Sequence, residues 1–219
     1  MKKIVLTGGP CAGKSTALER LKKIFGERVM VVPEAATMLM AGGFPKPGRD
    51  LSWSPEWQRH LQNAVFPLQC TLEDACELAA REKGAEILIC DRGLLDGAAY
   101  TPGGLPAFLE TFGVDEGGAH GRYARVIHLE SVAVCNPALY GNIGNEVRFE
   151  TQEEAAALDA KTAATWQNHP NWQLVPGCCG IEVVLEAVIA AVAEELALPP
   201  VLPAKALHPD VPAPAPRMA

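Results

Sequence analysis

Eight consecutive residues near the start of the chain match the pattern GxxxxGK[ST], whose chemistry is phosphate binding. Its glycines let backbone N–H groups surround phosphate oxygens, and the helix that follows adds the positive end of its dipole. The pattern assigns Lys14 to the β- and γ-phosphates and the hydroxyl of Ser15 to Mg²⁺. A glycine-rich turn that binds nothing is the alternative, which the preceding apolar run disfavours. The predicted nucleotide-binding residues are Gly8, Gly9, Pro10, Cys11, Ala12, Gly13, Lys14, Ser15 and Thr16.

A second candidate for phosphate chemistry is the acid that ends the apolar run 87–90. Asp91 should lie at the carboxyl end of a buried strand, where ligands of open α/β sheets bind, and would organise Mg²⁺ directly or through water. Capping of the next helix is its alternative role. Arg92 follows, where hydrolytic machines of such folds commonly place a water-polarising glutamate, and its fixed cation suits phosphate oxygens. Transfer to a bound acceptor is therefore favoured over hydrolysis.

The base for such a transfer is predicted at the end of another apolar run, 29–32. Glu34 should reach the same edge of the sheet and accept the proton of an attacking hydroxyl. Its alternative role is structural, in the first turn of a helix, where negative charge is favourable. The Gly- and Asn-rich segment 135–150 suits a lid or is a plain surface loop. The predicted catalytic residues are Lys14, Glu34, Asp91, Arg92 and Arg148.

The acceptor side is defined less sharply. Trp53 lies in the Pro- and Gly-containing loop 42–54 and could stack on a planar base, whereas Trp57 fits ordinary packing equally well. Three glutamines, Gln69 among them, offer amides to a base edge or are solvated. An acid and a tyrosine four residues apart after Arg92 bind the acceptor or simply hold their helix. The predicted acceptor-binding residues are Trp53, Gln58, Gln62, Asp96 and Tyr100.

The elements that must position these residues alternate between short apolar runs and longer helical stretches, the pattern of a parallel sheet covered by helices. Pro67 is predicted to kink or divide the long helical region. The predicted strands span 4–6, 29–32, 86–90, 126–129 and 172–175, and the predicted helices span 14–25, 34–41, 55–83, 151–168 and 180–198.

Composition limits the class of protein. The 219 residues fit one α/β domain over 1–198, and seven of the 18 prolines fall in 199–219, which predicts a flexible or polyproline-like tail. A net charge of −7 argues against duplex nucleic acid as a partner, though not against a small cationic pocket. Seven cysteines without metal-ligand spacing, no export signal and no apolar span indicate a cytoplasmic protein.

Several of these segments together resemble a P-loop family of AAA-type ATPases and kinases. The family includes the ribosylnicotinamide kinase domain of a bifunctional NAD-biosynthesis regulator and an animal protein needed for translocation of a TRP-like channel. Deoxynucleoside and thymidylate kinases are more distantly similar. The resemblance implies a P-loop NTPase fold with a five-stranded parallel sheet of order 2-3-1-4-5. It covers nearly all of 1–197 and is carried by segments 7–16, 31–34, 53–62, 91–100 and 140–148.

The leading hypothesis is an ATP- and Mg²⁺-dependent kinase that phosphorylates a hydroxyl of a small molecule, a nucleoside or riboside. The alternative is a nucleotide-binding switch or adaptor that binds ATP or GTP with little transfer, and the third hypothesis is an ATP hydrolase. The acceptor, the preference between ATP and GTP and the oligomeric state are open at this stage.

Overall fold

The computed structural model describes residues 1–140 and 151–198, and within them the predicted sheet is present. Five parallel strands are arranged in the order β2-β3-β1-β4-β5, which confirms the predicted α/β fold and strand order. The strands lie within about two residues of the predicted bounds. They are β1 (Lys2–Thr7), β2 (Val29–Val32), β3 (Ile87–Asp91), β4 (Arg125–Leu129) and β5 (Trp172–Val175).

Helices connect the strands and cover the sheet. The α-helices are α1 (Lys14–Phe25), α2 (Ala35–Ala41), α3 (Pro55–Lys83), α4 (Gly104–Phe112), α5 (Glu116–Gly121), α6 (Val132–Cys135), α7 (Pro137–Tyr140), α8 (Gln152–Trp166) and α9 (Ile181–Glu195). Three 3₁₀ helices are η1 (Gly26–Arg28), η2 (Leu94–Tyr100) and η3 (Gly177–Cys179).

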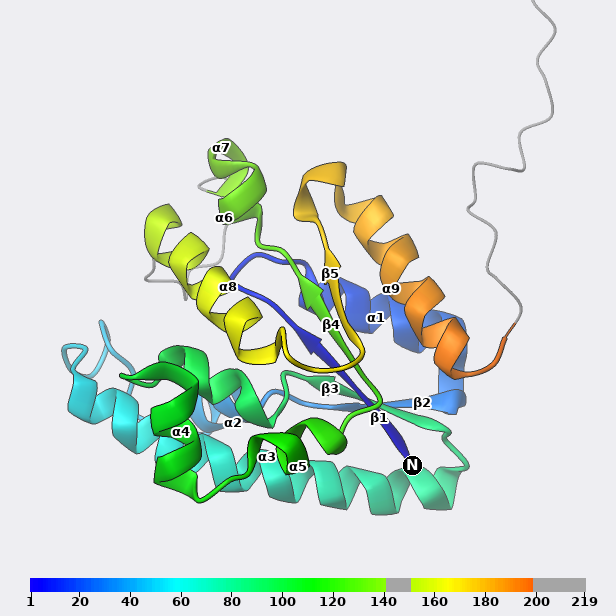
Figure 1. Ribbon diagram of the computed structural model, residues 1–219, viewed down its shortest axis with the longest axis horizontal. Coiled ribbons are helices and arrows are strands. Elements are labelled where there is room, and N and C mark those ends of the chain that lie inside the picture. The colour runs from blue at the N-terminus through cyan, green and yellow to red at the C-terminus, as the bar shows by residue number, and fades with distance from the viewer. Residues whose placement is uncertain (141–150, 199–219) are drawn as a thin grey trace, which may run out of the picture.

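The sheet separates two cores (Figure 1). On one face, α1 and α9 pack on alternate residues of the central strand, Ile4 and Leu6, in a core made of apolar side chains. On the other face, α3, η2, α4 and α8 cover Val5 and Leu88. Because β1 is covered on both faces, its residues 4–6 form a continuous apolar run.

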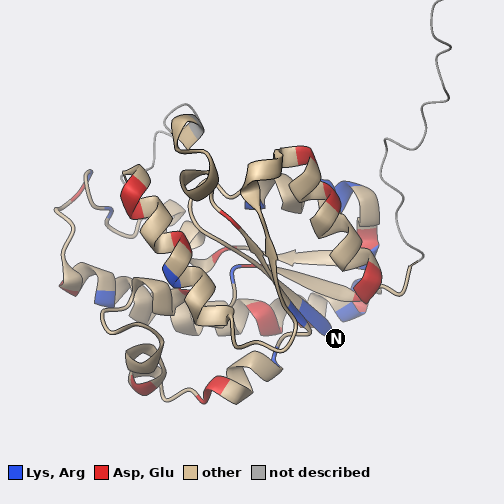
Figure 2. Cartoon of the chain, turned by 45° about the horizontal axis from the view of Figure 1, so that its top comes forward, with Lys and Arg blue, Asp and Glu red and all other residues tan. Residues whose placement is uncertain are grey.

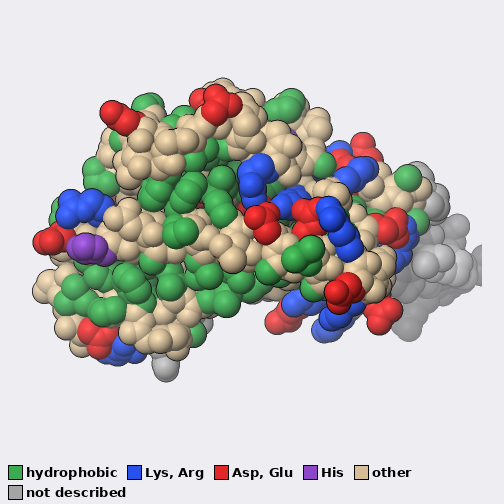
Figure 3. All heavy atoms as spheres, turned by 90° about the horizontal axis from the view of Figure 1, so that it is seen from below, with side chains coloured by type: hydrophobic (Ala, Val, Ile, Leu, Met, Phe, Trp, Pro, Cys, Tyr) green, Lys and Arg blue, Asp and Glu red, His purple; other side chains and the backbone are tan. Residues whose placement is uncertain are grey.

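Helix α3 corrects one expectation from the sequence. It runs unbroken from Ser54, whose hydroxyl accepts the Trp57 N–H, to Gly84, so Pro67 does not divide it. Packing along its length outweighs the one hydrogen bond that proline removes. Figure 3 shows the face of the molecule on the side of α3, with a small group of charged and His side chains at one end, apolar side chains beside it and a larger group of charged side chains toward the other end.

Two expectations fall outside the described residues: the proline-rich tail over 199–219 and the position of Arg148 in the predicted lid. Within 1–140 and 151–198, no helix is both long enough and apolar enough to cross a membrane. Basic and acidic side chains are interspersed over the helices in the view of Figure 2, as expected for a chain with net charge −7.

Candidate active site

The GxxxxGK[ST] stretch forms the turn between β1 and α1, the position in which this pattern binds phosphate. Gly13 adopts a φ of 84° immediately before Lys14 begins the helix. Gly8 adopts a φ of 134°, and a Cβ added there would lie 2.0 Å from the carbonyl oxygen of Leu129. Neither position accepts a side chain without moving the backbone, so the glycines fix the shape of the phosphate loop.

The loop is held from outside by the helix α8. Asp159 Oδ1 accepts hydrogen bonds from the backbone N–H of Gly9 (2.7 Å) and of Ser131 (3.1 Å). The Ser131 hydroxyl in turn donates to the carbonyl oxygen of Pro10. Because Asp159 is 150 residues away in the sequence, no local signal identifies it as part of the phosphate loop.

Lys14 lies inside this turn. Its Nζ donates to the carbonyl oxygens of Gly8 and Gly9, both at 2.9 Å. Burial, assisted by the charge of Arg92, lowers the pKa of Lys14 to about 7. A polyphosphate bound in the loop would favour the charged form and raise this pKa again.

Oxygen atoms suited to Mg²⁺ lie at the two predicted positions. Asp91 ends β3, and its carboxylate has no hydrogen bond or ion pair with another described residue. Burial and the nearby Glu34 raise the pKa of Asp91 to about 6, although the charges of Lys14 and Arg92 act in the opposite direction. Ser15 is exposed at the start of α1. These oxygens fit Mg²⁺, which is held in such sites by one or two protein ligands together with substrate phosphates and water.

Arg92 connects the phosphate side to the predicted base. Its Nε donates to Glu34 Oε1 at 2.5 Å, and its Nη1 donates to the carbonyl oxygen of Gly8 at 3.2 Å. Burial alone would raise the pKa of Glu34, but Arg92, the Thr37 hydroxyl and Lys14 together hold that pKa below its usual value. Glu34 is therefore a carboxylate at neutral pH, in contact with the cation predicted to bind phosphate.

Asp96 is occupied by protein partners, which favours its predicted structural role over acceptor binding. Its Oδ1 accepts from the Thr7 hydroxyl and from Arg92 Nη1. Its Oδ2 accepts from the backbone N–H of Gly93 (2.8 Å) and from Trp166 Nε1 (3.0 Å). Asp96 thus orients Arg92 and attaches η2 to α8, although it also lines the cleft described below.

Helix α3 also holds the turn that carries Arg92. Gln69 Nε2 donates to the Arg92 carbonyl oxygen and to Glu73 Oε1, both at 3.2 Å. The fully buried Glu73 accepts the Tyr123 hydroxyl at 2.7 Å, and that hydroxyl accepts the N–H of Leu94 at 2.8 Å. The Gln69 amide therefore donates its hydrogen bonds within the protein and not to the edge of a bound base. These contacts hold Arg92 at a φ of 70°.

A cleft of about 830 Å³ opens beside Glu34 and Arg92. Trp53, Gln58, Gln62 and Tyr100 all line it, and Trp53 is 61% exposed. Gln58 Nε2 and Gln62 Oε1 are buried without a hydrogen-bond partner among the described residues. A donor and an acceptor left unpaired four residues apart on α3 are suited to a ligand edge that carries both kinds of group.

The structure therefore brings together the predicted phosphate loop, Glu34, Asp91, Arg92 and the predicted acceptor residues, whereas Arg148 lies outside its description. No group of three or more His, Cys, Asp and Glu side chains in 1–140 and 151–198 is arranged to hold a metal ion.

A phosphate loop between the central strand and first helix of a 2-3-1-4-5 parallel sheet defines the P-loop NTPase class. The model of the AAA domain family matches residues 3–175, so the chain belongs to that family. None of the curated proteins matches it significantly. Among solved structures it is similar to a deoxyadenosine kinase of M. mycoides with bound dATP, with a TM-score of 0.52, 14% identity, and coverage of 90% of this chain and 100% of that chain.

Proposed function

We propose that this chain transfers the γ-phosphate of ATP, with Mg²⁺, to a hydroxyl of a nucleoside or related riboside. The observation that carries the proposal is the contact between Arg92 and Glu34 at the junction of the phosphate loop and the cleft. A cation for phosphate and a carboxylate for a hydroxyl proton are thus adjacent at the place where donor and acceptor would meet. The fold shared with a deoxyadenosine kinase is compatible with this activity.

Each residue of the site has a separate role in the proposed reaction. Lys14 and Arg92 would bind phosphate oxygens, and Ser15 and Asp91 would hold Mg²⁺, which neutralises charge on the phosphates. Glu34 would accept the proton of the attacking hydroxyl as the new O–P bond forms and the bond to the leaving ADP breaks. Arg148 is proposed as a further phosphate contact from the segment 141–150.

The cleft supports a planar acceptor. The two unpaired glutamine amides could bind a heterocycle edge, and the exposed Trp53 offers a ring for stacking. Incubation of the purified chain with ATP, Mg²⁺ and a panel of nucleosides and nicotinamide riboside tests the proposal. One acceptor should yield ADP and phosphorylated product in equal amounts. Tight nucleotide binding without transfer to any acceptor would instead indicate a nucleotide-binding switch.

A further inference from the structure

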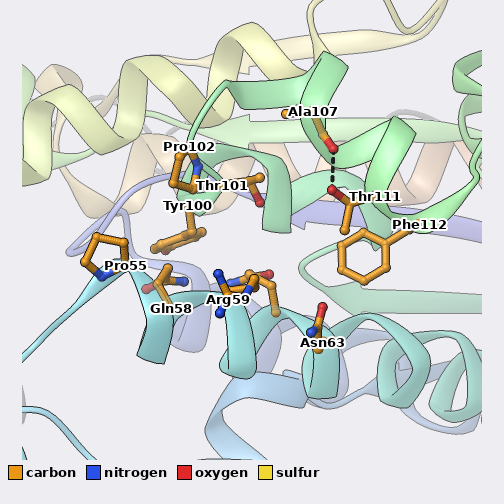
Figure 4. Close-up of a pocket in the computed structure, with 11 residues that line it drawn as sticks. Pro55, Gln58, Arg59, Asn63, Tyr100, Thr101, Pro102, Ala107, Thr111 and Phe112 are labelled. Atoms are coloured by element: carbon orange, nitrogen blue, oxygen red, sulfur yellow. Dashed lines mark hydrogen bonds between the residues drawn. The ribbon is translucent and has the colours of Figure 1, made fainter.

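A second, smaller cavity of about 270 Å³ adjoins the acceptor cleft. Figure 4 shows that it lies between the first turns of α3, the segment after η2, and α4. The two cavities have part of their wall in common, so a ligand in the cleft could extend into the smaller chamber. The shared residues are Gln58, Gln62, Tyr100, Thr101 and Pro102.

The side chamber contains a cation that no described residue neutralises. Arg59 lies on its α3 side, between Gln58 and Asn63 (Figure 4), and is exposed. Its guanidinium has no hydrogen bond or ion pair with another residue in 1–140 or 151–198. All the residues that line the chamber are neutral apart from Arg59.

The acids of the main cleft do not supply a counter-charge either. Glu34 and Asp96 both pair with Arg92. Glu154 accepts the backbone N–H of Thr151 in the capping box of α8. Each carboxylate that lines the cleft therefore already has a partner, and no acid of the described residues neutralises the positive charge in the side chamber.

The rest of the chamber wall suits a flat group. Phe112 closes one side with an aromatic ring, and the buried Gln58 and Gln62, each 7% exposed, form the wall shared with the cleft. Gln58 Nε2 is an unpaired donor, and a carboxylate or ring nitrogen could accept from it. A ring bounded by these residues would bring a substituent toward Arg59.

We infer that the side chamber is a subsite for a carboxylate carried by the planar ring of the acceptor, with Arg59 as the residue that selects it. A guanidinium matches a carboxylate through two parallel hydrogen bonds, which an uncharged carboxamide cannot reproduce. The inference deepens the proposed function, because it specifies the chemical class of acceptor that the cleft prefers.

Binding of two ring fragments tests the subsite without any phosphoryl transfer. Benzoate and benzamide have the same ring and nearly the same shape, but the amide is neutral and has an NH2 donor in place of one acceptor oxygen. Their dissociation constants can be measured by protein NMR on the full chain. The wild type should bind benzoate about tenfold more tightly than benzamide, with shift changes at Thr101 and Thr111. Arg59→Gln should remove that preference. Arg81→Gln, an exposed arginine near the other end of α3, is the matched control and should retain it.

The outcomes separate this inference from the proposed kinase activity. Equal binding of the two fragments to the wild type, or a benzoate preference that persists in Arg59→Gln, would overturn the subsite even if the chain phosphorylates ribosides. Lys161 lines the main cleft. If the benzoate preference is lost in Lys161→Gln but not in Arg59→Gln, the carboxylate binds in the main cleft, and this result would also overturn the subsite. A preference lost only in Arg59→Gln supports the subsite even if no transfer is found.

Discussion

The phosphate side and the acceptor side of this active site are built in different ways. On the phosphate side, one short turn contributes backbone groups, and two of its polar groups are paired within the protein, Gly9 N–H with Asp159 and Lys14 Nζ with two carbonyl oxygens. On the acceptor side, side chains from several helices line a cleft, and two buried amide atoms have no partner among the described residues. If the proposed function is correct, we expect the phosphate side to be generic and the acceptor side to determine specificity.

Lys14→Ala tests the phosphate side and should have the largest effect. The substitution removes the cation proposed to contact the β- and γ-phosphates, so turnover should fall by about 10³ or more, with weaker nucleotide binding. Acceptor-dependent ADP formation is the measurement. Lys23→Ala, in the last turn of the same helix, serves as the control and should retain activity. Substantial turnover in Lys14→Ala would show that the loop is not the nucleotide site.

Glu34→Gln tests the junction of the two sides. Glutamine can still accept the hydrogen bond from Arg92 Nε but is not a base, so kcat should fall by roughly 10²–10⁴. The nucleotide dissociation constant should change little, which calorimetric titration can establish. A comparable loss in nucleotide affinity would make Glu34 a structural partner of Arg92 rather than the base. Glu19→Gln, on the exposed face of α1, is the matched control.

Gln62→Met should affect only the acceptor side. It removes a buried oxygen without a partner, so the free energy of unfolding should stay equal or rise, by up to about 1–3 kcal/mol. The acceptor KM should rise by about tenfold, while the KM for ATP should not change. Thermal unfolding and steady-state kinetics measure the two effects. If both KM values rise together, or if neither rises, Gln62 does not act on the acceptor side alone. Gln167→Met, at an exposed site, is the control for the added methionine.

The smallest predicted effect is a pH dependence of nucleotide binding. The pKa of Lys14 is about 7 in the free protein, and bound phosphate should raise it, so binding takes up a proton above pH 7. Without Mg²⁺, the affinity for the nucleotide should therefore fall by up to about tenfold between pH 8 and pH 9. The phosphate, with a pKa of about 6, does not titrate in this range. Titrations in two buffers of different ionisation enthalpy measure the proton uptake. In Lys14→Arg the dependence should vanish, and its persistence there would assign it to another group.

The same contrast determines how much the sequence could predict. The phosphate loop is contiguous, and its apolar strand and following helix are local signals, so its position was predicted to the residue. The position of Glu34, Asp91 and Arg92 at one edge of the sheet could be predicted because parallel strands present their carboxyl ends there, whereas their roles stay predictions. The residues that position this edge through hydrogen bonds from other elements, Asp159 among them, could not be predicted.

Those positioning residues depend on tertiary contacts. Glu73 and Trp166 occupy helix positions that fit ordinary packing, and only the folded chain shows that they reach the Arg92 turn and Asp96. Helix α5, with the sequence EGGAHG, was not predicted because glycine has a low helix propensity. Conversely, Pro67 suggested a kink or a division of the helical region, and packing of α3 keeps the helix undivided. Pattern and propensity define the loop and the sheet, but not the contacts between helices.

The central claim is that donor and acceptor meet at the Arg92–Glu34 contact. The most direct test is the stoichiometry of ADP and phosphorylated riboside formed by the purified chain with ATP, Mg²⁺ and the acceptor panel. The account predicts one ADP per phosphorylated acceptor and no ADP formation without an acceptor. ADP formation that is independent of every acceptor, with free phosphate as the product, would contradict it.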